Sequence, residues 1–312
     1  MLLGRAANGL YWMSRYIERA ENMARLVDTG LRLALTQTSS PVDEWTSVMQ
    51  SAGVSQVFEK TVGCYEAEAV IDFLLRGPTN PSSVMTCMER ARQNGRMVRT
   101  ALTREAWESL NEAWMALRRL LREPVDEREL PQVLEAIKRE TALIRGSFQG
   151  TMLRNDIFDF ARLGTMVERA DNTARILDVK YYVLLPSVQW VGTPLDNQQW
   201  HSILRSVSAQ RSFRWSYGDY TAANIADYLI LNRRMPRSLA YCYRGIVDAL
   251  EFLAEEYGAR HDCHRTADAQ LSELGAASIA DIFENGLHEF LTDFIKGNAT
   301  LGDQIAAAYQ FY

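Results

Sequence analysis

Apolar residues recur along almost the whole chain with a period of 3.6 residues, and strand-like alternation of apolar and polar residues is almost absent. A period of 3.6 places apolar side chains on one face of an α-helix, whereas a strand needs a period of two. The pattern therefore predicts an all-α protein. The predicted helices cover residues 8–37, 42–51, 65–76, 81–100, 103–122, 129–149, 153–184, 197–208, 219–232, 236–257, 264–275 and 280–311, with a break in the last one left open.

Short polar segments that contain proline separate the predicted helices. In GPTNPSS (77–83) we expect Asn80 to cap the next helix and Pro81 to be its first residue. Proline suits that position because the first turn of a helix leaves its N–H groups unpaired. The segment NRRMPRS (232–238) predicts the same arrangement around Pro236. Two further segments predict connectors, REPVDERELP (122–131) and LPSVQWVGTPLDN (185–197).

One charged helical segment occurs twice. YIERAENMARLVD (16–28) is matched at an offset of 150 by MVERADNTARILD (166–178), and seven of the eleven residues from position 18 to 28 are identical. The match continues at an offset of 155, which predicts one short insertion near Pro186 and Pro194. The pairs in this second frame are Trp45 with Trp200, Tyr65 with Tyr220, Asp72 with Asp227, Pro81 with Pro236, Ser83 with Ser238 and Cys87 with Cys242.

A frame that persists across several elements indicates an internal duplication. We expect a helical bundle of two tandem, pseudo-symmetric units of about six helices each. The units would cover residues 1–150 and 151–312. They should pack as one body, because the junction near Gly150 lacks the composition of a linker.

The repeated helix has an apolar face and a polar face. At 100° per residue, an apolar stripe opposes the direction of Glu18, Asn22 and Arg25. The stripe consists of Met13, Ile17, Ala20, Ala24, Val27 and Leu31. The second copy repeats the polar set as Glu168, Asn172 and Arg175, and the two copies carry Arg19 and Arg169 beside their glutamates.

Three interpretations of the polar faces are open. They are solvated, with Glu21–Arg25 and Asp171–Arg175 as i,i+4 ion pairs. Alternatively, they are buried and join the two units through paired, hydrogen-bonded charges. In the third interpretation, both copies line one polar cleft, where Glu18 and Glu168 are the candidate catalytic residues and the neighbouring Arg and Asn side chains bind a ligand.

Charge and cysteine content narrow the class of protein. The chain has 39 acidic and 34 basic residues, a formal net charge of −5, so it predicts no general affinity for nucleic acid or membranes. The four cysteines, without CxxC spacing, predict reduced, buried thiols in a cytoplasmic protein. The N-terminal residues do not resemble a signal peptide, and no run of about 18 apolar residues predicts a membrane span.

Known catalytic and cofactor motifs are not recognisable. The carboxylate pairs Glu18–Glu21 and Glu168–Asp171 would suit Mg²⁺ with a phosphorylated ligand, but a di-iron bundle needs Glu-x-x-His motifs, which the chain lacks. HDCH (261–264) predicts a histidine pair in a loop or at a helix start, since zinc would need a fourth ligand. Without a GxSxG motif or a glycine-rich phosphate loop, we expect no metal site and no cofactor.

Two groups of arginines could bind an anion. One comprises Arg205, Arg211 and Arg214. The other comprises Arg233, Arg234 and Arg237, where a helix begins and its N-terminal amides favour anions. The alternative, which we prefer, is that both groups are ordinary surface charge.

Several segments together resemble one known family. They are GRAANGLYWMSRYIERAENMARLVD, NPSSVMTCMERARQNGRMVR, ALTREAWESLNEAW, FARLGTMVERADNTARILD and LNRRMPRSLAYC. This set, in this order over nearly the whole chain, is similar to the alpha-E domain, an all-helical bacterial domain whose Glu–Arg motif would be Glu18–Arg19 and Glu168–Arg169. One departure is Gln93, where the family more usually has glutamate.

The resemblance implies partners rather than an activity. Members of the family are commonly encoded beside, or fused to, a circularly permuted ATP-grasp ligase-like protein, and a transglutaminase-like cysteine peptidase is another common neighbour. By analogy, the chain would be a non-catalytic or accessory component of a bacterial peptide or amide-bond synthesis or modification system. The alternative is an enzyme of peptide or amide chemistry, or a binder of a Mg-phosphate ligand, that uses the duplicated Glu–Arg motifs in a shared cleft. Whether the chain is an enzyme is open at this point.

Overall fold

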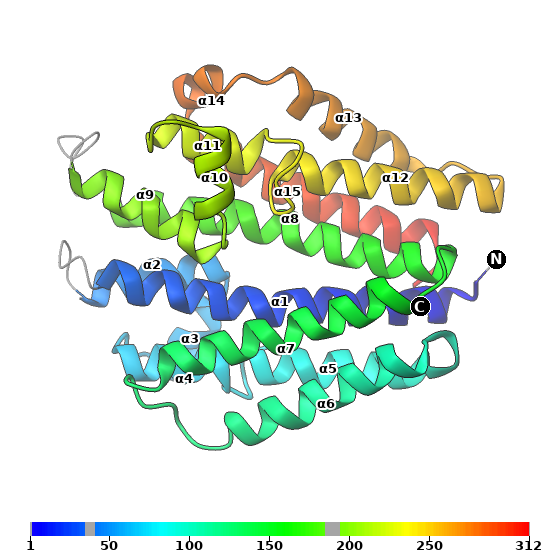
Figure 1. Ribbon diagram of the computed structural model, residues 1–312, viewed down its shortest axis with the longest axis horizontal. Coiled ribbons are helices and arrows are strands. Elements are labelled where there is room, and N and C mark those ends of the chain that lie inside the picture. The colour runs from blue at the N-terminus through cyan, green and yellow to red at the C-terminus, as the bar shows by residue number, and fades with distance from the viewer. Residues whose placement is uncertain (1, 35–40, 185–193, 312) are drawn as a thin grey trace.

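The computed structural model describes residues 2–34, 41–184 and 194–311, and within these ranges the chain is helical without any strand (Figure 1). The all-α prediction is confirmed. The helices of the first half are α1 (Gly4–Ala34), α2 (Pro41–Ala52), α3 (Ser55–Thr61), α4 (Ala67–Leu75), α5 (Val84–Met97), the 3₁₀ turn η1 (Arg99–Ala101), α6 (Arg104–Leu120) and α7 (Leu130–Thr151). Those of the second half are α8 (Asp156–Leu184), α9 (Pro194–Ser206), α10 (Gln210–Ser216), α11 (Ala222–Ile230), α12 (Leu239–Tyr257), α13 (Asp262–Ala276), α14 (Ile279–Asn285) and α15 (Leu287–Ala308).

Helices α1 and α8 run side by side through the middle of the molecule in the same direction (Figure 1). Helices α5 and α7 pack against α1, while α12 and α15 pack against α8. Helix α2 also reaches α8, and α9 reaches α1, so each half covers part of the other's central helix. The repeated Glu–Arg segments are therefore the two central helices. The duplication itself remains a prediction from the sequence.

A glycine allows the two central helices to approach closely. Ala20, Ala24, Ala170 and Ala174 are fully buried on the apolar sides of these helices. Gly164 of α8 lies against the backbone of Tyr11 in α1, where a Cβ atom would collide with the Tyr11 carbonyl oxygen. Close approach at Gly164 then puts the charged side chains on the same faces of the two helices within reach of each other.

The starts of α5 and α12 differ from the prediction. Pro81 and Pro236 lie in turns, and the caps are Ser83 and Ser238. The Ser83 hydroxyl accepts from the Thr86 N–H at 3.2 Å, and Ser238 accepts from Tyr241 N–H at 3.1 Å. A serine hydroxyl can accept a hydrogen bond from an unpaired N–H of the first helical turn, which explains why the serines are the caps. The prolines lie two residues earlier, in the preceding turns. Asn80 caps a turn instead, because its side chain accepts from the N–H of Ser82 at 2.9 Å.

Other boundaries also needed the structure. The short helices α3 and α10 were not predicted, since seven residues show too few turns for a periodic pattern. The last predicted helix breaks at Gly286, whose φ of 103° lies outside the helical range. Most of the predicted 185–197 connector, including Pro186, and the predicted end of the first helix at 35–37 lie outside the described residues.

The core accounts for most aromatic and cysteine side chains that the sequence singled out. Trp45 and Trp200 are buried. All four cysteines are free, and three are buried, but the prediction of a buried thiol is wrong for Cys64, which is exposed. Burial raises the pKa values of Cys87 and Cys242 to about 12, so these thiols stay protonated. None of the helices described here is long and apolar enough to cross a membrane.

Candidate functional site

Glu18 lies at the contact between α1 and α8 and is fully buried. Its Oε1 accepts from Nε of Arg169 on α8 and from Nη1 of Arg237, both at 2.9 Å. Its Oε2 accepts from Arg169 Nη2 at 3.0 Å and from Nη1 of Arg145 on α7 at 3.4 Å. Three arginines from α8, α7 and the turn before α12 thus occupy both oxygens of one carboxylate.

Glu21 extends this cluster by one helical turn. Its Oε1 accepts from Arg25 Nη2 at 2.6 Å, and Arg237 and Arg145 both form ion pairs with it. The Thr141 hydroxyl of α7 donates to Oε2 at 2.9 Å. The predicted Glu21–Arg25 pair is therefore confirmed, but it is buried and shared with arginines from other helices rather than solvated.

Glu168 makes the reciprocal contact from α8 to α1. Its Oε2 accepts from Arg19 Nη2 at 2.9 Å and from Arg15 Nε at 2.8 Å. Each Glu–Arg motif therefore binds the other motif, Arg19 to Glu168 and Arg169 to Glu18. The second i,i+4 pair, Asp171 with Arg175, is also present at 2.6 Å.

The arginines keep both motif carboxylates ionised. Burial alone would raise the pKa of Glu18, but Arg169, Arg237 and Arg145 together lower it well below the ordinary range. Burial would also raise the pKa of Glu168, but the charges of Arg19 and Arg15 lower it to about 2. A general base working near neutral pH needs a pKa close to 7 and a free lone pair. Neither carboxylate has such a pKa, and both oxygens of Glu18 already accept two N–H groups each.

Burial and like charge act together on Arg237. Desolvation, followed by the nearby charge of Arg25, lowers its pKa to about 10, although Glu18 and Glu21 oppose this. Arg233 and Arg234 are exposed. The structure therefore divides the predicted group of three arginines. Arg233 and Arg234 are surface residues, whereas Arg237 is buried and binds Glu18.

The two asparagines of the repeated polar face are buried as well. Asn22 is 1% exposed and Asn172 is 3% exposed. Neither polar atom of the Asn22 side chain, nor the amide nitrogen of Asn172, has a hydrogen-bond partner among the described residues. The network of charged side chains among the described residues therefore does not include the amide nitrogens of Asn22 and Asn172. The solvated interpretation is wrong for Glu18, Asn22, Arg25, Glu168 and Asn172.

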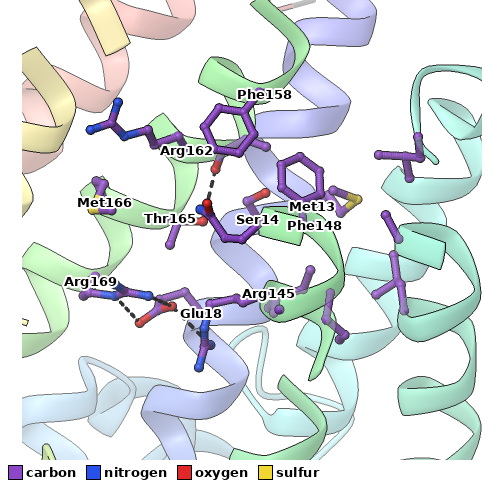
Figure 2. A pocket seen from close by; sticks show the side chains of 18 of the residues that line it. Met13, Ser14, Glu18, Arg145, Phe148, Phe158, Arg162, Thr165, Met166 and Arg169 are labelled. Atoms are coloured by element: carbon purple, nitrogen blue, oxygen red, sulfur yellow. Dashed lines mark hydrogen bonds and ion pairs between the residues drawn. The ribbon is translucent and has the colours of Figure 1, made fainter. Parts of the chain in front are cut away.

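A cavity of about 360 Å³ opens beside Glu18 (Figure 2). Glu18, Arg145 and Arg169 lie together at one end of it, and Phe148, Phe158 and Met13 lie at the other. Helices α1, α6, α7, α8 and α12, with Leu102 after the 3₁₀ turn η1, surround this space. The complete lining is Met13, Ser14, Ile17, Glu18, Leu102, Ala106, Leu110, Ile144, Arg145, Gly146, Phe148, Gln149, Phe158, Ala161, Arg162, Thr165, Met166, Arg169 and Tyr241.

One wall of the cavity carries a second charged group. Arg162 Nη2 donates to Asp248 at 3.2 Å, and its Nη1 is 3.8 Å from Asp159. Burial raises the pKa of Asp159 to about 6, although Arg162 and Arg154 oppose the shift. This carboxyl therefore titrates closer to neutral pH than the two motif glutamates.

Two important residues of the site were not predicted. Arg15 lies one helical turn before Arg19, and Arg145 lies on α7 outside both repeated segments. Arg15 could have been found from its i,i+4 spacing to Arg19, which puts both on one face. The spacing of Arg145 to its own helix neighbours gives no such signal, because its partners belong to α1.

A metal site has little support in the described structure. No group of three His, Cys, Asp or Glu side chains in the described residues is arranged to hold a metal ion. All four oxygens of Glu18 and Glu21 are in contact with arginine or threonine donors, which leaves them unsuited to Mg²⁺. His261 and His264 form the capping box of α13, as a histidine pair at a helix start.

Comparisons with known proteins agree with this geometry. Residues 2–310 match a family described as a predicted alpha-helical domain with a conserved ER motif, named Alpha-E. Relatives include an uncharacterized protein from Mycobacterium bovis and two from Mycobacterium tuberculosis, each 22% identical over 326 residues. The match covers 96% of this chain and 36% of each relative, so the chain spans about a third of their length. No solved structure matches the chain. With a family match over essentially its whole length and both Glu–Arg pairs joining α1 to α8, the chain belongs to the Alpha-E family.

Proposed function

We propose that the chain is a non-catalytic, accessory module that acts with an ATP-grasp-like ligase in a bacterial peptide or amide-bond synthesis or modification system. The observation that carries the non-catalytic part is the pairing of both motif glutamates with arginines. Glu18 accepts from Arg169, Arg237 and Arg145, and the pKa values of Glu18 and Glu168 are lowered. These groups hold two central helices together and have no proton to exchange near neutral pH.

The lengths of the relatives support the modular part of the proposal. The match reaches across 96% of this chain but only 36% of each mycobacterial relative. A unit that occurs inside longer chains is suited to work beside other domains. The ligase-like and transglutaminase-like partners themselves come from the family resemblance. The cytoplasmic location that we propose for the complex comes from the four cysteines without CxxC spacing.

The alternative function is an enzyme of peptide or amide chemistry, and the cavity next to Glu18 is the observation in its favour. In that case Glu18 would exchange a proton with a substrate in the cavity. Its two oxygens, however, already accept four N–H groups. An enzyme would therefore have to break part of this network in each turnover.

Co-purification tests the proposal. The chain and the neighbouring ATP-grasp-like protein would be produced together, isolated through a tag on one of them and sized by light scattering. We expect a defined complex and a change in ATP turnover when the chain is added. If the chain neither binds that protein nor changes its turnover, the proposed function is wrong.

A double variant separates the module from the enzyme. Glu18→Gln with Glu168→Gln should lose cooperative thermal unfolding and the complex together if the motif is structural. If the double variant folds and binds its partner normally but product formation stops, the enzyme is the better explanation. Glu108→Gln, in the exposed Arg104–Glu108 pair, is the matched control and should behave as the unmodified chain.

A further inference from the structure

The cavity beside Glu18 has a size and lining typical of a small-molecule site. Its volume of about 360 Å³ lies within the usual range of about 300–1,000 Å³ for ligand pockets. One end is apolar and aromatic, with Phe148 and Phe158 stacked at a ring-centroid distance of 5.7 Å. The opposite end carries Arg145 and Arg169 (Figure 2).

The charged end has more cations than anions. The cluster around Glu18 and Glu21 contains two carboxylates and four guanidinium groups, those of Arg25, Arg145, Arg169 and Arg237. Excess charge of one sign is costly away from water unless an opposite charge compensates it. Arg145 has the most exposed of these four side chains, at 25%, and it lines the cavity. The excess positive charge therefore borders the open space.

Glu18, the carboxylate in the cavity wall, is not available to bind a cationic group of a ligand. Both Glu18 oxygens already accept from arginines. The other charged side chain on the wall, Arg162, adds a further guanidinium held by Asp248. The wall therefore presents hydrogen-bond donors to a guest, and an anionic group is the guest that suits them.

Comparison of the two repeated segments explains why the space exists on this side. At the offset of 150, Ala161 and Thr165 on the cavity wall correspond to Tyr11 and Arg15 of α1. Arg15 bonds Glu168 and lies 5.5 Å from the Tyr11 ring centroid, so large side chains occupy the equivalent place beside Glu168. Beside Glu18 the corresponding side chains are small, and the freed volume is part of the cavity.

We propose that this cavity binds a small ligand that carries a carboxylate or phosphate group on an apolar body. The anionic group would lie against Arg145 and Arg169, and the apolar body against Phe148 and Phe158. The site needs only this chain. The inference therefore goes beyond the proposed accessory function and does not depend on the ligase-like partner.

Titration calorimetry with three probes tests the chemistry. The probes are N-acetyl-L-phenylalanine, phenyl phosphate and the neutral N-acetyl-L-phenylalaninamide. Hydrogen bonds to charged groups predict at least about tenfold tighter binding of an anion than of the amide. The tighter of the two anions identifies the preferred group. Equal binding of the amide, or no binding of either anion, would overturn the proposal.

A pair of glycines on α7 supplies a matched control for the location. Gly146 lines the cavity and Gly150 does not, and a Cβ atom at either would meet nothing within 4 Å. We expect Gly146→Phe to weaken anion binding at least tenfold, while Gly150→Phe stays within twofold of the unmodified chain. Unchanged binding by Gly146→Phe would place the ligand elsewhere and reject this site.

A second blocking variant protects the test against misfolding. Thr165→Leu enlarges the opposite wall without adding charge and should also weaken binding, with thermal melts as the check on folding. If either blocking variant unfolds, the other one decides the location. Anion binding without a ligase complex would reject only the accessory function, and a complex without anion binding would reject only this site.

Discussion

Glu18 and Glu168 carry the same motif but are held in different ways. Glu18 is surrounded by arginines from three separate parts of the chain, and Glu168 by Arg15 and Arg19 of a single helix. The Arg15 and Arg19 side chains keep 15% and 22% of their surface exposed. In the Glu18 network, the Arg237 side chain keeps 9% and the Arg145 side chain keeps 25%. The same Glu–Arg motif thus forms a network with three parts of the chain in one copy and a clamp with a single helix in the other.

This difference indicates where specialisation can occur. The Glu168 side is filled by the opposite central helix, because Arg15 and the aromatic residues of α1 occupy the space next to it. The Glu18 side depends on Arg145 and Arg237, which come from outside the repeated segment, and it borders the cavity. A fixed clamp on one side leaves the other side available for a ligand.

Removing each carboxylate in turn should give the largest difference between the two sides. Glu18→Gln leaves the four arginines of the cluster with Glu21 as the remaining carboxylate, and we expect a loss of about 3–5 kcal/mol in the free energy of unfolding. Glu168→Gln leaves Arg15 and Arg19, which can turn toward solvent, and should cost about 2 kcal/mol. Urea unfolding at pH 7 measures both. Equal losses would show that burial of the arginines does not distinguish the two sides.

The helices and their most important faces were predictable from local sequence. Period-3.6 patterning identified the long helices because it reports one buried stripe per helix. The repeated Glu, Asn and Arg identified the surfaces through which α1 meets α8, although that face was polar. Burial of both faces of α1 could not be read from the pattern, because a polar residue looks the same whether water or arginine surrounds it.

The partners of the motif were harder to predict for a physical reason. Arg145 is 127 residues from Glu18, and Arg237 is 219 residues away. Local periodicity holds no information about such contacts. The cavity depends on side-chain size at corresponding positions, and the sequence does contain that signal in Thr165, which corresponds to Arg15. It can be interpreted only once the two helices are known to pack in parallel.

Close packing of the central helices provides the next test. Gly164→Ala puts a Cβ atom against the Tyr11 carbonyl oxygen, and neither backbone can move without separating α8 from α1. We expect a loss of about 1–3 kcal/mol, as for other overpacked interiors. Gly146→Ala, on the open side of the cavity, should instead add about 0.5–1 kcal/mol through better helix propensity. Opposite signs in thermal or urea unfolding would confirm that only one of these glycines is required by packing.

The i,i+4 arginines should differ in the same direction as their glutamates, but by less. The Arg25 side chain is 8% exposed and donates to Glu21 and to the Ser206 carbonyl oxygen. The Arg175 side chain is 28% exposed and donates to Asp171 and the Ser51 carbonyl oxygen. We expect Arg25→Gln to cost about 2 kcal/mol and Arg175→Gln about 1 kcal/mol. A larger cost for Arg175→Gln would reverse the assignment of the buried side.

The pH dependence of stability should separate the clamp at Glu168 from Asp159, which lies next to Arg162 of the cavity wall. The pKa of Glu168 falls from 4.5 to about 2 on folding, so its contribution is present above pH 4.5 and is lost as the pH falls toward 2. The pKa of Asp159 rises from 3.8 to about 6, so its contribution is present below pH 3.8 and is lost as the pH rises through 6. Urea unfolding of Glu168→Gln and Asp159→Asn from pH 3 to 8 measures both.

The stability difference between the unmodified chain and Glu168→Gln should grow with pH and level off above 4.5. The difference from Asp159→Asn should shrink between pH 4 and 6. A flat difference for Asp159→Asn would show that this carboxyl is solvated and not shifted by burial.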